Sequence, residues 1–389
     1  MEELIYLDNA ATTWPKPDSV YDFAISFYRK MGVNPGRSGF DKAIEAGNIV
    51  EDLRKRLTRF FGGDEDAPER LCFSYNATDA LNLIINGLLR RGDHVVTTNL
   101  EHNSVIRPIN HLVRDGIVEA TFVSFNEQGF IDPDDIKKAI RSNTRLVIVN
   151  HGSNVLGTVQ PLKEIGAVCR EKGVLFAVDS SQTAGVIPIH MREMNIDALA
   201  FTGHKALMGF TGIGGLCVRR HVEIRHTRSG GTGVRSAYPY HLDEYPYRME
   251  YGTPNMIGIA SLWAGQDWIE LKGMKNIHEH EMNLTRKLVN GFREIEGVKI
   301  YCCQGMGDHL STVTINVEGI DAGNVGIMLD VDYSIATRTG LHCAPLVHKQ
   351  IGTLEIHGGV RFAVGAFNKE DHIEAAVHAI REIAKAARK

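Results

Sequence analysis

Two polar residues that follow apolar runs are the first candidates for chemistry. Asp179 ends the run VLFAVD, and Lys205 comes shortly after the run ALAFT. A carboxylate at the end of a buried strand needs a compensating positive charge, because desolvation disfavours its ionised form, and a protonated ring nitrogen would provide that charge. Taken alone, Asp179 is slightly better explained as a helix N-cap and Lys205 as a solvated loop residue. Together they indicate the pair that binds pyridoxal phosphate, a Schiff-base lysine and an aspartate on the ring nitrogen.

A phosphate group on such a cofactor would need donors close to the lysine. Ala77 and Thr78 follow the run LCFS at the expected start of a helix, where free backbone N–H groups bind anions. Thr202 and His204 flank the lysine in TGHK and add side-chain donors. A nucleotide site is a poor alternative, because the sequence has no G-x-x-x-x-G-K-S/T motif.

Three further residues have a chemical reason to face a substrate. His102, in LEHNSVIRP, can stack on a flat ring or carry a proton, although an ordinary loop histidine is about equally expected. Cys343 lies in RTGLHCAP, close to Arg338 and next to His342, and cationic neighbours favour the nucleophilic thiolate. Arg361 is a single charge inside the apolar pattern GGVRFAVG, where a substrate carboxylate is a suitable partner.

Short apolar runs between residues 71 and 218 are the elements that must position these side chains. Runs that are apolar throughout are typical of strands buried on both faces of a mainly parallel sheet. The stretches between them have helix signals, such as Asp132-Pro133 at a start and Gly173 at an end. We predict an α/β fold with helices covering a mainly parallel sheet, in which ligands bind at the carboxyl ends of the strands. The expected strands are LCFS (71–74), HVVTT (94–98), TFVSF (121–125), LVIVN (146–150), VLFAVD (174–179), ALAFT (198–202) and GGLCV (214–218).

The pattern changes after about residue 255. A long helical stretch over roughly 256–297 is followed by the strand-like segments VKIYC and STVTINVE, the RTGLHCAP loop, a further strand and a final helix from Asn368. This order predicts a smaller α+β unit. The segment 228–253, rich in Gly, Pro and Tyr, is expected to be a loop near the site or at an interface.

Composition excludes several other classes of protein. The 389 residues contain 43 Lys and Arg against 47 Asp and Glu, a net charge of −4, which argues against a nucleic-acid binder. The apolar runs are strand-length, so no membrane helix is expected. The first residues show neither a basic segment nor an apolar one, so no secretory signal is expected. Six scattered cysteines without a C-x-x-C pair predict reduced thiols in a cytoplasmic protein.

These residues resemble a known family over nearly the full length of the chain. The sequence is similar to class V aminotransferases of fold type I, and within them to the short-loop, second group of cysteine desulfurases. The resemblance rests on motifs that occur in the family's order: YLDNAATT (6–13), LEHNSVIRP, SNVLGTVQP, VDSSQTAG, TGHK, YGTPN and RTGLHCAP. It implies the aminotransferase-like fold, with a large cofactor-binding domain over 15–255 and a small domain, carrying the cysteine loop, over 1–14 and 256–389.

The resemblance also assigns roles around pyridoxal 5'-phosphate. Lys205 matches the lysine that bonds the cofactor, Asp179 the partner of the ring nitrogen, Gln182 the residue near the ring hydroxyl and His102 the histidine that stacks on the ring. The residues that match the phosphate site are Ala77, Thr78, Thr202 and His204, together with Thr253 of YGTPN, which would reach the phosphate of a neighbouring subunit. The resemblance therefore implies a homodimer with shared active sites.

The implied activity converts L-cysteine to L-alanine and leaves a persulfide on Cys343. Asn154 and Arg361 match substrate-binding positions, with Arg361 on the α-carboxylate, and Arg338 matches the arginine that begins the cysteine loop. The sulfur would pass to an acceptor protein or a thiol, in iron–sulfur cluster assembly or other sulfur trafficking. No metal, nucleic acid or membrane is implied.

Several alternatives stay open at this point. The phosphate turn reads Asn-Ala-Thr-Asp where relatives often have Gly-Thr-Thr-Glu, Asn103 replaces a common second histidine, and Leu341 replaces a histidine of the cysteine loop. These departures leave selenocysteine lyase or cysteine-sulfinate desulfinase activity possible, as well as another class V C–S lyase, hydrolase or transaminase. A metal-dependent hydrolase lacks the needed ligand spacing, and a non-catalytic sulfur carrier would not need Lys205 and Asp179. Cys302 and Cys303 are more simply explained by burial than as a second thiol site.

Overall fold

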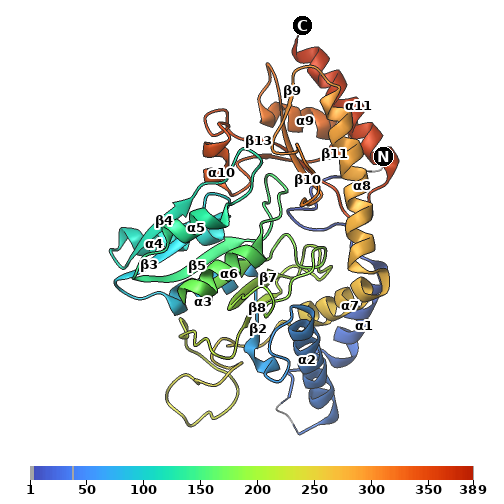
Figure 1. Ribbon diagram of the computed structural model, residues 1–389. Helices are drawn as coiled ribbons and strands as arrows, with labels where there is room; N and C mark the ends of the chain where they lie inside the picture. The colour runs from blue at the N-terminus through green and yellow to red at the C-terminus, as the bar shows by residue number, and fades with distance from the viewer. Residues whose placement is uncertain (1–3, 37–38, 389) are drawn as a thin grey trace.

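The computed structural model describes residues 4–36 and 39–388 (Figure 1). The ends of the predicted small domain, residues 1–3 and 389, lie outside the described residues. In the described ranges no helix is both long enough and apolar enough to cross a membrane.

The largest element is a seven-stranded sheet in the strand order β2-β8-β7-β6-β5-β3-β4. Only β8 runs antiparallel to its neighbours β2 and β7, and the other pairings are parallel. The mainly parallel sheet is therefore confirmed. Its strands are β2 (Leu71–Ser74), β3 (Asp93–Thr98), β4 (Val118–Val123), β5 (Thr144–Asn150), β6 (Leu175–Asp179), β7 (Ala198–Thr202) and β8 (Gly214–Val218).

Both faces of this sheet are covered, which explains why its central strands are largely apolar. Along β5, Val147 and Val149 join one hydrophobic cluster, whereas Leu146 and Ile148 join another on the opposite face. Helices α3 (Ala77–Leu88), α4 (Asn103–Arg114), α5 (Pro133–Ala139) and α6 (Leu162–Lys172) alternate with the strands. Gly173 ends α6 with a φ of +67°, in the left-handed region that favours glycine.

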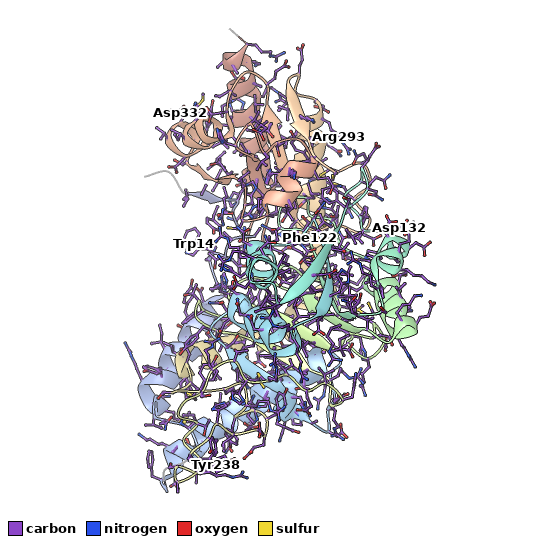
Figure 2. All side chains as sticks on the ribbon, turned by 90° about the vertical axis from the view of Figure 1, so that its left-hand side faces the viewer. Trp14, Phe122, Asp132, Tyr238, Arg293 and Asp332 are labelled. Atoms are coloured by element: carbon purple, nitrogen blue, oxygen red, sulfur yellow. The ribbon has the colours of Figure 1, made fainter. Side chains whose placement is uncertain are left out.

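A second, antiparallel sheet has the order β12-β13-β10-β9 and its own hydrophobic cluster, which includes Val313, Phe362 and Phe292. Its strands are β9 (Val298–Ile300), β10 (Thr312–Val317), β12 (Arg338–Gly340) and β13 (Gly359–Ala363), and β1 (Ile5–Tyr6) pairs separately with β11 (Ile335–Ala336). The helices of this part are α8 (Met274–Arg293), α9 (Ala322–Tyr333), α10 (Pro345–Gln350) and α11 (Glu370–Ala387). In Figure 2, Asp332 and Arg293 mark this part, and Tyr238 marks the opposite end of the molecule.

The helical stretch predicted over 256–297 is two helices. α7 (Met256–Lys272) ends at Gly273, whose φ is +80°, and α8 begins directly after it. α7 packs against α1 (Asp18–Met31) and α2 (Asp41–Phe60) and adds Ile259 and Leu262 to a cluster of the large sheet. The division of the chain after residue 255 stays a prediction.

Candidate active site

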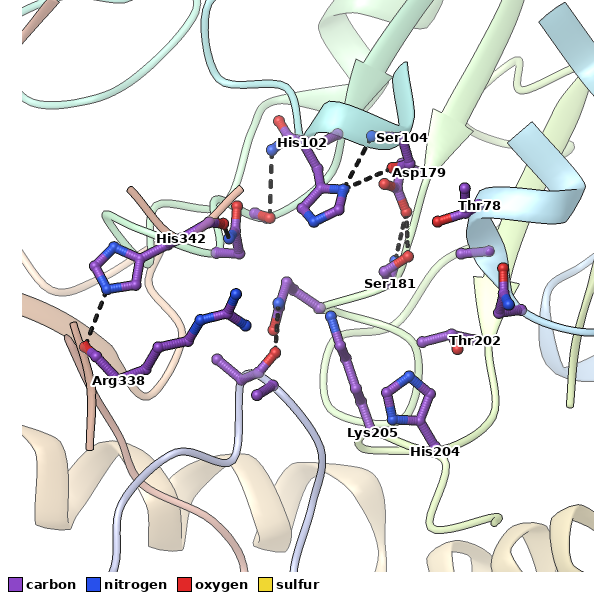
Figure 3. Close-up of a pocket in the computed structure, with 18 of the residues that line it drawn as sticks. Thr78, His102, Ser104, Asp179, Ser181, Thr202, His204, Lys205, Arg338 and His342 are labelled. Carbon is purple, nitrogen blue, oxygen red and sulfur yellow. Dashed lines mark hydrogen bonds between the residues drawn. The ribbon is translucent and has the colours of Figure 1, made fainter. Parts of the chain in front are cut away.

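A cavity of about 210 Å³ lies at the carboxyl ends of the parallel strands, where the sheet predicts a ligand. Residues that follow β2, β3, β5, β6 and β7 meet there, and the small sheet contributes residues of β12 and β13. Figure 3 shows Lys205 projecting into the centre, with Thr202 and His204 on one side and Arg338 and His342 on the other. The predicted residues that line the cavity are Ala77, Thr78, His102, Asn154, Asp179, Gln182, Thr202, His204, Lys205, Arg338 and Arg361.

One end of the cavity has the chemistry of an anion site. α3 begins at Ala77 with Asn76 as its N-cap, so the first-turn amides of Ala77 and Thr78 point out of the helix without helical acceptors. Thr202 Oγ1 is buried and has no hydrogen-bond partner among residues 4–36 and 39–388. A buried hydroxyl without a partner, next to a helix N-terminus, fits a bound phosphate, which would satisfy both.

The side-chain amine of Lys205 is a weaker base than that of an ordinary lysine. Burial lowers the pKa of its amine to about 8, and Arg361 and Arg338 act in the same direction, while Asp179 opposes them. The backbone before it is held firmly, because the His204 carbonyl accepts from Thr12 Oγ1 at 3.1 Å and from Lys16 Nζ at 2.5 Å. A fixed amine of lowered pKa suits bonding to an aldehyde and transferring a proton.

Asp179 and His102 face the same space from the ends of β6 and β3. Asp179 Oδ1 accepts from the backbone N–H of Ser181 at 2.9 Å and also from the Ser181 hydroxyl. His102 Nδ1 accepts from Ser104 N at 3.0 Å, as the N-cap of α4. Burial lowers the pKa of His102 to about 4, so the ring is neutral and its proton is on Nε2.

Arg361, on β13, is a fully buried cation whose guanidinium faces the cavity. Its Nη1 donates to the Asn154 carbonyl at 3.1 Å, and its Nη2 donates to Asp8. Its Nε and the Asn154 side-chain oxygen are buried without partners among the described residues. A carboxylate on Arg361 and an amine on Asn154 would satisfy these atoms.

The cysteine loop closes the other side of the cavity. Arg338 Nη2 lies 3.5 Å from Cys343 Sγ, so the guanidinium predicted from sequence does face the thiol. His342 and Cys343 both have left-handed backbones, with φ of +48° and +59°, which side chains adopt at a cost. Hydrogen bonds hold this conformation: Asn154 Nδ2 donates to His342 O at 2.6 Å, and Asn103 N donates to Cys343 O at 2.7 Å.

Three other predicted residues lie outside this arrangement. Thr253 is exposed and borders a separate, larger cavity with Tyr75 and Asp79, so it does not join the cavity of its own chain. Cys302 and Cys303 are buried, and burial raises their thiol pKa values to about 11 and about 12.

Within residues 4–36 and 39–388, no group of three or more His, Cys, Asp or Glu side chains is placed to hold a metal ion.

Comparison with known proteins places this geometry in a family. A family model described as aminotransferase class-V matches residues 5–376. The chain belongs to the class-V aminotransferase family. Among its relatives, a probable cysteine desulfurase of Methanothermobacter thermautotrophicus is 32% identical, over 99% of this chain and 96% of the relative. The cysteine desulfurase IscS of Clostridium botulinum is 29% identical, over 100% of this chain and 96% of the relative.

Solved structures agree with this class-V aminotransferase assignment. The apo structure of the cysteine desulfurase from Thermococcus onnurineus NA1 is 33% identical and superimposes with a TM-score of 0.91, covering 98% of this chain and 95% of that one. The fold class and the family resemblance predicted from the sequence are thus confirmed.

Sequence reasoning assigned no role in this class-V aminotransferase site to four residues that support it. Ser181 fixes Asp179, Asp8 pairs with Arg361, Lys16 donates to the carbonyl before Lys205, and the amide of Asn103 holds Cys343. Ser181 follows Asp179 by two positions in VDSSQ, a spacing that suggests a local hydrogen bond. Asp8 had a weaker signal, as a charged residue directly after the short apolar segment IYL.

Proposed function

We propose that this protein is a cysteine desulfurase that converts L-cysteine to L-alanine and takes up the sulfur on Cys343. The observation that carries the proposal is that Arg338 and His342 line the same cavity as Lys205 and Asp179. Cys343 follows His342 directly, and its Sγ lies 3.5 Å from Arg338 Nη2. A thiol that contacts Arg338 at the edge of a cavity holding a partly buried lysine of lowered pKa supports sulfur transfer more directly than amine transfer. The names of the relatives point to the same activity.

Pyridoxal 5'-phosphate is the proposed cofactor, and the residues present fit it. The unpartnered Thr202 hydroxyl and the first-turn amides of α3 would hold its phosphate, and Asp179 would pair with its ring nitrogen. The neutral His102 would stack on the ring, and Gln182 would lie near its hydroxyl. When bound, this cofactor supplies an electron sink for a carbanion at the substrate α-carbon.

Side chains of the protein would bind the substrate, transfer the proton and accept the sulfur. Arg361 and Asn154 would bind the α-carboxylate and amine of the substrate, and Lys205 would move the α-proton. The Cys343 thiolate would then bond to the substrate sulfur while the carbon–sulfur bond breaks. The electron pair of that bond stays with the three-carbon skeleton, which is protonated and leaves as alanine, and the sulfur remains as a persulfide on Cys343.

Product analysis tests this proposal. With L-cysteine and a thiol reductant, the holoenzyme should release alanine and sulfide in equal amounts. Pyruvate and ammonia in place of alanine would indicate a different C–S lyase. Faster turnover of L-selenocysteine or of cysteine sulfinate would move the assignment to the alternative activities of the same scaffold.

The rate at which apo-protein bonds pyridoxal phosphate should depend on pH through Lys205. Only the unprotonated amine attacks an aldehyde, and burial lowers the pKa of Lys205 to about 8. The rate should therefore rise with pH up to about 8 and flatten above it, well below the value of about 10.4 for an ordinary lysine. Stopped-flow absorbance would measure this rate, and a continued rise beyond pH 10 would contradict the lowered pKa.

Arg361→Lys should weaken substrate binding more than it slows turnover. The substitution keeps the positive charge but loses the fork that bonds Asn154 O and Asp8 while presenting Nε to the cavity. We expect KM for L-cysteine to rise about tenfold or more, with a smaller change in kcat. Initial rates over a range of L-cysteine concentrations measure both, and an unchanged KM would exclude Arg361 as the carboxylate site.

Subunit organisation, partners and location complete the proposal. The exposed position of Thr253, outside its own cavity, supports a homodimer in which this residue serves the neighbouring site, and sedimentation equilibrium of the holoenzyme would show a mass of two chains. The sulfur would leave to an acceptor protein or a thiol. The six free cysteines support a cytoplasmic location, which fractionation of cells would test.

A further inference from the structure

A continuous chain of hydrogen bonds runs behind the cysteine loop and is not part of the proposed chemistry. His342 Nε2 bonds to Arg338 O at 3.0 Å, and His342 Nδ1 bonds to His348 Nε2 at 3.2 Å. His348 Nδ1 in turn bonds to Thr353 Oγ1 at 2.7 Å. His342, His348 and Thr353 are 2%, 0% and 1% exposed, so water does not compete for these bonds. Figure 3 shows the first link, between His342 and Arg338.

The Arg338 carbonyl at one end, together with the neutral charge of both rings, fixes the direction of this chain of hydrogen bonds. A carbonyl oxygen only accepts, so His342 carries its proton on Nε2. The other nitrogen of a neutral ring must accept, so His348 donates from Nε2, and its Nδ1 accepts from the Thr353 hydroxyl.

Both rings are neutral at ordinary pH. The cations that act on His342 are Arg361 of β13 and Arg338 of β12, and His348 of α10 contacts it directly. Burial and the two arginines hold the pKa of His342 well below its usual range. Burial alone lowers the pKa of His348 to about 4.

This chain of hydrogen bonds is attached to a strained part of the backbone. His342 and Cys343 both have positive φ, a conformation that side chains adopt only when surrounding contacts impose it. The ring of His342 ties residue 342 back to the Arg338 carbonyl, and the Arg338 guanidinium reaches Cys343 Sγ. Arg338, His342 and Cys343 thus form a closed loop, and His348 on α10 anchors it from behind.

We propose that the Thr353–His348–His342 chain is a positioning device that keeps the Cys343 thiol against Arg338 and directed at the substrate sulfur. His348 and Thr353 touch neither cofactor nor substrate in this scheme and act only through His342. The inference rests on the proposed function for its catalytic consequence. Its structural consequence, the contact between Cys343 and Arg338, is independent of that function.

Substitutions at His348 test the proposal. His348→Leu removes the donor to His342 Nδ1 at similar volume, whereas His348→Gln keeps an amide N–H that can reach it. We expect His348→Leu to slow persulfide formation by about tenfold or more, the size of effect that loss of a donor to a buried acceptor gives, and His348→Gln to restore most of the rate. The spectral change on adding L-cysteine should be the same in all three proteins.

The second readout does not need turnover. Iodoacetamide should modify Cys343 of the substrate-free holoenzyme preferentially, because the other five cysteines are buried. The contact with Arg338 holds Cys343 Sγ in place. The alkylation profile, meaning the time course of Cys343 modification at a fixed pH, should therefore become faster in His348→Leu, where the loop is released, and return to the wild-type course in His348→Gln. His94→Leu is a matched control: His94 is an equally buried histidine, bonded to Thr144 and Thr121 in the large sheet, and its loss should lower stability without moving the alkylation profile.

The outcomes separate the two proposals. An unchanged alkylation profile and persulfide rate in folded His348→Leu would overturn the positioning role. If that variant does not fold, Thr353→Val removes only the outer donor and should shift the profile in the same direction by a smaller amount; no shift there would also overturn it. A wild type that forms no persulfide, with the alkylation shift intact, would refute the desulfurase proposal alone.

Discussion

Replacing Cys343 with alanine is expected to reduce sulfide release from L-cysteine by at least about 10³-fold, because the substitution removes the nucleophile that accepts the sulfur. The cofactor should stay bound and the protein should stay yellow, since Lys205 and the phosphate site are untouched. Sulfide assays under reducing conditions measure the rate, and the visible spectrum measures cofactor content.

The matched control for this prediction is Cys169→Ala. Cys169 is buried in α6, and burial raises its thiol pKa to about 12, so it has no means of attacking a substrate. Activity should persist in this control. If Cys343→Ala is as active as the wild type, sulfur does not pass through Cys343, and a C–S lyase on another substrate becomes the better assignment.

Lys205→Ala should have an effect of similar size for a different reason. The variant loses the amine that bonds the cofactor and moves the α-proton, so turnover should fall by about 10³-fold or more. Its yellow colour should disappear on dialysis, in contrast to Cys343→Ala. Absorbance before and after dialysis and alanine formation from L-cysteine measure both effects.

Lys163→Ala is the control for Lys205→Ala, because Lys163 is exposed on α6. Its colour and turnover should match the wild type. Retention of colour and alanine formation by Lys205→Ala would show that another amine holds the cofactor, and it would remove the central residue from this account.

The sequence predicted the large sheet because its central strands are buried on both faces. An apolar run such as LVIVN is then best placed as a strand covered on both faces, and the polar residue at its end lies at the ligand-binding edge of the sheet. Asp179 and Lys205 could be recognised in this way, since Asp179 is the last residue of β6 and Lys205 lies shortly after the end of β7. Their meeting in one cavity follows from β6 and β7 being adjacent and parallel.

Contacts between distant segments had no such signal. Asp8 and Arg361 pair through tertiary packing of the N-terminal segment beside β13, and no local pattern indicates the pairing. His342 and His348 look like two of 17 histidines until the loop and α10 bring their rings together. The break at Gly273 is a similar case, because one glycine inside an apolar periodicity does not by itself end a helix.

The most direct test of the central claim is the mass of the peptide that carries Cys343. The holoenzyme would be treated with L-cysteine in the absence of reductant, trapped by alkylation and digested. This account predicts the gain of one sulfur atom on the Cys343 peptide, together with one alanine per modified site. An unmodified Cys343 peptide in a sample that has formed alanine would contradict it.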